Sequence, residues 1–117
     1  MKVRNVTRGT VLGVNVRVAR GFFGRMIGLL GEDRLEDGEG LWISPCSSIH
    51  SIGMRFIFDA IFIGPDGRIA HLRERFPKYG FSGVVTKAMG VLELPEGTIE
   101  RTGSQPGDEI CFEPRPF

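Results

Sequence analysis

Apolar residues recur with a period of two in several short runs, and this alternation predicts a chain built mainly of β-strands. Residues 14–18 alternate valine with polar side chains, as a half-buried strand does. Together with the β-patterned run that precedes Gly13, they predict a hairpin within residues 3–18. Residues 56–63 form the strongest predicted strand and end at a Gly-Pro-Asp-Gly turn, so we expect residues 68–76 to return as its partner.

Three shorter runs, at residues 41–43, 90–94 and 109–112, complete the predicted strands. Only residues 22–30 place apolar side chains at helical spacing over two turns, and residues 98–101 could add a single turn closed by Gly103. The predicted fold class is therefore mainly β (α+β). It would be a small β-barrel or two packed, mostly antiparallel sheets, with one helix near residues 22–30.

Length and composition favour a single globular domain over residues 1–117, with a C-terminal tail that frays from about residue 113. A formal net charge of +1 gives no electrostatic reason to expect nucleic acid or a membrane surface as partner. Two cysteines are too few for a disulfide scaffold, and the first residues lack the apolar run of a signal peptide. We therefore expect a reduced, cytoplasmic protein, with a monomer as the default oligomeric state.

The stretch from Cys46 to Met54 holds the least ordinary chemistry. Cys46, His50 and Met54 are spaced by four, which keeps them on one face in either a helix or a strand. They are soft or borderline ligands that suit copper or zinc, and a Cys–His pair could also act as a nucleophile with its base. Zinc needs more protein ligands than these, and no cysteine-hydrolase signature surrounds Cys46. We therefore expect no cofactor and favour a packing role over metal binding or catalysis.

Charged residues inside apolar segments form a second group of candidates. Asp59 lies within the 56–63 strand and needs a partner there, and Arg55 is the nearest cation in sequence. In the alternative, Arg55 faces a cleft and holds a carboxylate or phosphate. Arg25 and Glu93 form another candidate buried pair that would specify the fold, and Asp108 is interpreted as a structural turn charge.

These residues lead to three hypotheses, of which a binding module ranks first. Its cleft would accept a small anionic ligand or a peptide, since an arginine and a histidine would lie beside aromatic walls on a loop. The predicted binding residues are Trp42, Cys46, His50, Met54, Arg55, Phe56 and Asp59. A structural or interaction domain without a ligand ranks second. An enzyme that uses Cys46 and His50, or a soft-metal site, ranks third.

The order of these landmarks resembles the bacterial and archaeal family called domain of unknown function 192. The matching segments run from about residue 14 to residue 112, and they are 16–19, 25–30, 35–40, 53–56, 59–63, 66–69, 92–97 and 107–108. The family often has Gly-Leu-Met where this chain has Gly28-Leu29-Leu30, and Phe-Trp-Met-Lys-Asn-Thr where it has residues 52–57. The chain is thus similar to a branch with Cys and Ile-His before Met-Arg-Phe. The resemblance implies a compact β-rich domain and no established activity.

Overall fold

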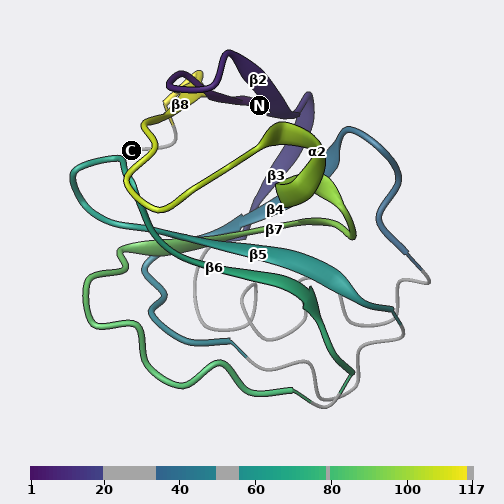
Figure 1. The fold of residues 1–117 in the computed structure, drawn as a ribbon, viewed down its shortest axis with the longest axis vertical. Coiled ribbons are helices and arrows are strands. Elements are labelled where there is room, and N and C mark those ends of the chain that lie inside the picture. Colours follow the sequence, from purple (N-terminus) through teal and green to yellow (C-terminus); the bar gives the residue numbers. More distant parts are fainter. Residues whose placement is uncertain (20–33, 50–55, 79, 116–117) are drawn as a thin grey trace.

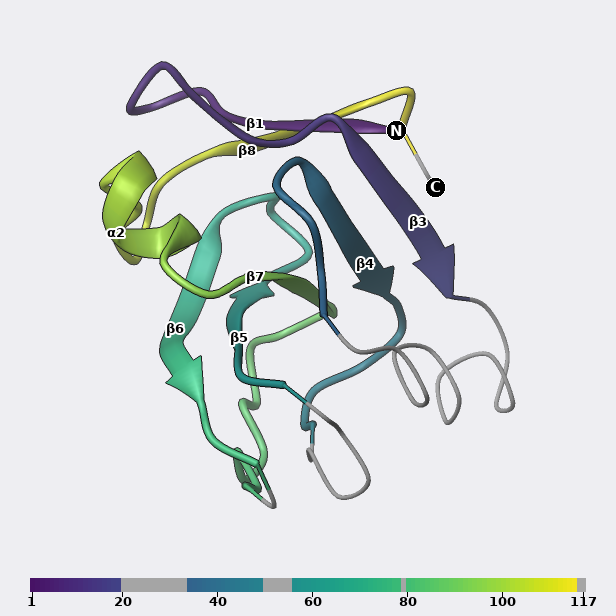
Figure 2. The same cartoon turned by 90° about the vertical axis from the view of Figure 1, so that its right-hand side faces the viewer.

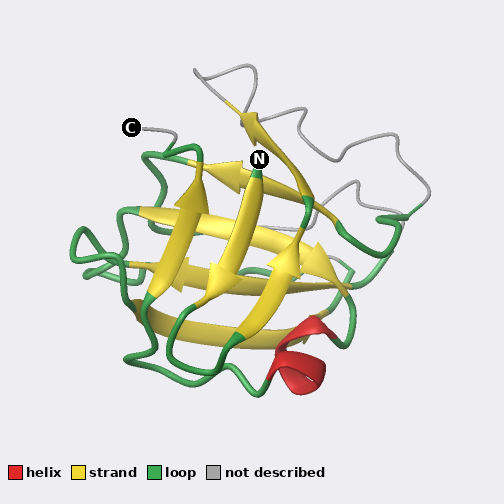
Figure 3. Ribbon diagram, turned by 90° about the horizontal axis from the view of Figure 1, so that it is seen from above, coloured by secondary structure: helices red, strands yellow, loops and turns green. Residues whose placement is uncertain are grey.

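The computed structural model describes residues 1–19, 34–49, 56–78 and 80–115, and these residues form two stacked β-sheets and one short helix. One sheet has three strands in the order β2–β1–β8, and the other has five in the order β3–β4–β7–β5–β6. Viewed from above, the strands of the two sheets cross one another (Figure 3). The mainly β prediction is confirmed in its two-sheet form, because the described strands do not close into a barrel.

The three-stranded sheet brings together the two ends of the described chain. β1 (Lys2–Asn5) lies between β2 (Thr10–Gly13) and β8 (Ile110–Glu113) and is antiparallel to both. The predicted hairpin is thus present as β1 and β2. The predicted final strand is also confirmed, and it continues through Glu113, whose carboxylate accepts a 2.6 Å hydrogen bond from Arg4 Nε.

β3 (Asn15–Ala19) leaves this hairpin and joins the five-stranded sheet, so the hairpin prediction was wrong for residues 14–18. It pairs in parallel with β4 (Glu39–Ile43). The chain turns at Gly13, where an added Cβ would lie 2.8 Å from Val16 Cγ2. Alternation reveals a strand without revealing its neighbour, and a parallel neighbour always lies beyond a long crossover connection.

β5 (Phe58–Ile63) is buried along its whole length between two antiparallel neighbours, β6 (Ile69–Phe76) and β7 (Gly90–Pro95). The predicted partner strand at 68–76 and the predicted strands at 41–43 and 90–94 are all confirmed. Helix α2 (Thr98–Thr102) is the predicted single turn, and Gly103 ends it in the left-handed conformation. It lies beside β6 at the edge of the sheet (Figure 2). The predicted helix at 22–30 lies outside the described residues.

The five-stranded sheet buries a different set of side chains on each face. The inner core, between the two sheets, is formed by residues that include Val3, Trp42, Ile61, Leu92 and Phe112. The opposite side of the five-stranded sheet, which we call the outer face, carries Leu41, Ile43, Phe58, Ala60, Phe62, Val91 and Glu93. Segments 44–49 and 80–89 lie on this side, away from the three-stranded sheet (Figure 1).

Candidate functional site

The centre of the outer face holds an acidic side chain among apolar neighbours. Glu93 lies in the middle of β7, opposite Leu41 of β4 on one side and Ala60 of β5 on the other. Its side chain is 6% exposed, and no described residue forms a hydrogen bond or ion pair with its carboxyl group. Burial raises the pKa of Glu93 from 4.5 to about 8, because the charged form loses its hydration in the apolar interior. At neutral pH this carboxyl is therefore mostly uncharged.

Strand register places two arginines in the same cross-strand row as Glu93. Arg17 pairs with Leu41 at one end of the row, and Arg73 pairs with Ala60 at the other. Each lies two strands from Glu93, which is about 10 Å at the usual strand spacing. Arg73 also stacks over Phe76, with its guanidinium carbon 5.2 Å from the ring centroid. The row thus has a neutral acid at its centre and a cation at each end.

Arg17 and Arg73 are not among the site residues predicted from the sequence. Both occupy charged positions in alternating runs, where a solvent-facing charge is the ordinary interpretation. Only the pairing of β3 with β4 and of β6 with β5 puts them in line with Glu93.

Cys46 packs at the border of the outer face. Its thiol is half-buried and donates a hydrogen bond to the backbone oxygen of Ser48 at 3.0 Å, while its backbone N–H donates to Met89 O. The predicted partners His50 and Met54 lie outside the described residues, as do Arg55 and Arg25. Among the described residues, no group of three or more His, Cys, Asp or Glu side chains is placed to hold a metal ion. The Cys–His and soft-metal hypotheses therefore stay predictions.

The two predicted aromatic walls lie on opposite sides of the sheet. Trp42 is 1% exposed and packs in the inner core against Phe112, with ring centroids 4.8 Å apart. It points away from the outer face, because Leu41 and Ile43 on either side of it point toward that face. Phe56 is half-buried on the outer face and contacts Phe58 edge to face, at 6.2 Å. Of the two, only Phe56 lies on the same face as Cys46.

Asp59 is fully buried and is engaged by backbone amides. The N–H of Arg75 donates to its Oδ1 at 3.0 Å, and the N–H of Ile99 donates to its Oδ2 at 2.8 Å. Ile99 belongs to the first turn of α2, so this carboxylate satisfies a helix N–H that would otherwise lack a partner. The same contact holds Arg75 at φ +49°, a conformation that non-glycine residues seldom adopt. Within the described residues, Asp59 therefore joins β5, β6 and α2.

Asp108 is likewise part of a hydrogen-bond network. Its Oδ2 accepts hydrogen bonds from Asn5 Nδ2, Arg8 Nε and the Gln105 N–H, at 2.9–3.0 Å. Burial alone would raise the pKa of Asp108, but the hydrogen bonds from Arg8, Asn5 and Gln105 outweigh it and lower that pKa below 3.8. The network ties the β1–β2 turn to the loop before β8.

No helix in the described part of the chain is both long and apolar enough to cross a membrane.

Comparison with known proteins gives a family and two solved structures. The family model described as Uncharacterized ACR, COG1430 (DUF192) matches residues 3–112. A protein of unknown function from Novosphingobium aromaticivorans DSM 12444 superposes with a TM-score of 0.78 at 22% identity, over 95% of this chain and 82% of that one. A "putative transcription regulator" from Sinorhizobium meliloti 1021 also gives 0.78 and 22%, over 94% and 89%.

At this level of identity, the two structures support the fold and carry no activity across. A search of curated proteins found no match. The family model, by contrast, spans nearly the whole chain. Its range includes all the described strands, apart from the first residue of β1 and the last residue of β8. The chain therefore belongs to the DUF192 family.

Proposed function

We propose that the protein is a binding module and that its site is the outer face of the five-stranded sheet, where it takes a small anionic ligand or a peptide with a free carboxylate. The single observation that supports this most strongly is the Glu93 carboxyl, buried at the centre of that face without a partner among the described residues. An unpaired buried acid costs stability, so it is more often found where a ligand uses it than where packing alone is required.

The chemistry of the face favours an anion. A protonated carboxyl can donate a hydrogen bond to a ligand carboxylate, whereas an ionised one would repel it. Arg17 and Arg73, at the ends of the same row, add positive charge on either side. Phe56, which is half-buried at this face, provides an apolar surface for the body of the ligand. Arg55 and His50, predicted from the sequence for the same role, lie outside the described residues.

A nucleic-acid ligand is less consistent with these features. The name of the Sinorhizobium protein concerns transcription, but a DNA-binding surface needs an excess of positive charge to neutralise several phosphates. The formal net charge here is +1, and Arg4, Arg8 and Arg75 each form an ion pair with an acid. We therefore favour a small ligand or peptide terminus.

The test is an NMR titration of the ¹⁵N-labelled protein with acetate, succinate and acetylated tripeptides, each tripeptide with a free or an amidated C-terminus. Binding to the outer face should shift the amides of Leu41, Ala60 and Val91. Affinity should fall about tenfold when the carboxylate is amidated. It should also fall above pH 8, when Glu93 ionises.

Two variants make the result specific. Glu93→Ala should lose the binding, whereas Glu74→Ala, which removes an exposed acid from β6, should keep it. The proposal is overturned if none of these probes shifts the outer-face amides, or if the two variants bind equally well.

A further inference from the structure

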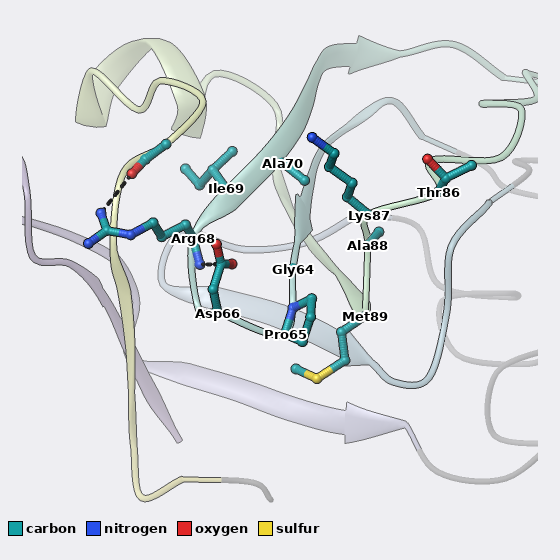
Figure 4. A pocket seen from close by; sticks show the side chains of 11 residues that line it. Gly64, Pro65, Asp66, Arg68, Ile69, Ala70, Thr86, Lys87, Ala88 and Met89 are labelled. Carbon is teal, nitrogen blue, oxygen red and sulfur yellow. Dashed lines mark hydrogen bonds between the residues drawn. The ribbon is translucent and has the colours of Figure 1, made fainter.

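A second region of the molecule has the form of a ligand site, and it lies apart from the row that contains Glu93. A cavity of about 720 Å³ opens between the β5–β6 turn, the segment before β7 and the turn before β8. We call it the turn pocket (Figure 4). Its volume is in the range of small-molecule sites. The residues that matter for its chemistry are Pro65, Asp66, Arg68, Ala70, Lys87 and Met89.

Backbone hydrogen bonds hold the walls of the turn pocket in place. Gly64 N–H donates to Arg68 O at 2.9 Å, Met89 N–H to Ile63 O at 2.7 Å, and Gly107 N–H to Ile69 O at 2.7 Å. These bonds tie the three segments to the ends of β5 and β6. A Cβ on Gly64 would lie 2.9 Å from Asp66 Oδ1 and 3.1 Å from Lys87 O, so the turn and the 86–89 segment are closely packed. The pocket is therefore preformed, which lowers the entropic cost of binding.

Three charged side chains line the turn pocket, and two of them are already engaged. Arg68 turns away from it and donates to Gly107 O at 3.1 Å, with Glu109 Oε1 3.7 Å from its other nitrogen (Figure 4). Asp66 Oδ1 accepts a hydrogen bond from the backbone N–H of Arg68 at 3.0 Å. The Lys87 ammonium has no hydrogen bond or ion pair with any described residue, and its side chain extends beside Ala70 (Figure 4). Lys87 is thus the cation left to meet a ligand.

The remaining walls are apolar and set the kind of ligand. Pro65, Ala70, Ala88 and Met89 provide carbon and sulfur surface, which favours an apolar body. One uncommitted ammonium matches a single negative charge. The Asp66 carboxylate also lines the turn pocket, so a second negative charge on the ligand, as in phosphate, is less favourable there. From these features we infer that the turn pocket binds a small organic monoacid, with its carboxylate on Lys87 and its apolar body against the neighbouring apolar wall, which begins at Ala70 (Figure 4).

Benzoate is the probe, with benzamide as its neutral counterpart. In a ¹³C-labelled protein, benzoate should shift the methyl signals of Ala70, Ala88 and Met89 in a saturable manner. Benzamide should bind about tenfold more weakly. Lys87→Met should weaken benzoate binding about tenfold and leave benzamide unchanged, while Lys87→Arg should retain most of the affinity.

Lys78→Met removes an exposed lysine from another loop and is the matched control, which should bind benzoate as the wild type does. Equal benzoate affinity in the Lys87→Met and Lys78→Met variants would overturn the inference. So would shifts confined to the outer face, or no saturable shift in the wild type. This inference is independent of the proposed function, because Glu93→Ala should leave benzoate binding at the turn pocket intact.

Discussion

Glu93 should make the free energy of unfolding depend on pH, because its pKa differs between the folded and the unfolded state. Its pKa of about 8 in the folded state lies above the ordinary value of 4.5, so between these pH values the folded state holds the extra proton. Stability therefore falls as the pH rises from about 5 to about 8, by on the order of 1 kcal/mol per pH unit. Below pH 4.5 Glu93 is protonated in both the folded and the unfolded state, so this loss of stability is absent. Above the folded-state pKa the loss is complete.

Replacing Glu93 with glutamine should remove this pH dependence. The amide keeps the size and the hydrogen-bonding capacity of the neutral acid but does not titrate. We expect the free energy of unfolding of Glu93→Gln, relative to wild type, to rise steadily from pH 5 to pH 8, as measured by urea denaturation. Glu74→Gln should show no such trend. Parallel wild-type and Glu93→Gln curves would show that Glu93 is already ionised or solvated.

Gly90 is a second position where one side chain decides stability. A Cβ at this position would lie 2.4 Å and 2.6 Å from ring carbons of Trp42, and 2.8 Å from Ile43 O. Gly90→Ala should therefore cost about 2 kcal/mol or more, because both the ring and the backbone would have to move. Thermal or urea denaturation measures the change, and a loss below about 0.5 kcal/mol would mean that β4 and β7 are less tightly packed than described.

At the scale of secondary-structure elements, Asp59 is the joint between β5, β6 and α2. Asp59→Ala should cost about 2–4 kcal/mol, because two backbone N–H groups lose their acceptor in a buried site. Asp59→Asn should cost less, since its remaining oxygen can accept from one of them. The two variants are compared by urea denaturation, with Asp66→Ala, in an exposed turn, as control. Similar stability of Asp59→Ala and Asp66→Ala would contradict this role.

Patterns within short stretches of sequence predicted most of the strands and helix α2. The features that they did not predict depend on contacts between distant parts of the chain. Alternation and turn residues identified β5, β6, β7 and α2 because these signals act over a few residues. The parallel pairing of β3 with β4 was missed because it joins segments separated by a crossover. Trp42 was assigned to a cleft because all three residues of its short run are apolar, and such a run does not reveal which face is inner.

The same limits apply to the candidate site. Leucines on both sides of Glu93 signalled its burial, but its place in a row with Arg17 and Arg73 depends on strand register, which the sequence does not reveal. Asp59 was expected to need a partner and has two, although they are backbone amides rather than a cation among the described residues. Lys87 was not singled out, because an exposed lysine in a loop carries no signal before the β5–β6 turn is placed beside it.

At the scale of the whole molecule, the Asp108 network holds the start of the chain against its end. The folded-state pKa of Asp108 is lowered, so its contribution to stability is present above about pH 4 and is lost as the pH falls through the folded-state value. Asp108→Asn should therefore be less stable than wild type at pH 7, and this difference should shrink at about pH 3. Urea denaturation at both pH values measures it, and a pH-independent difference would contradict the assignment.

A ¹³C NMR titration of the Glu93 carboxyl carbon tests the proposed site at its centre. The outer face can offer an uncharged acid to an anionic ligand only if this group keeps its proton at neutral pH. We expect a midpoint near pH 8, and an upward shift of that midpoint when a carboxylate ligand is bound. A midpoint near 4.5 would show a solvated or paired carboxylate, and it would contradict the proposed site.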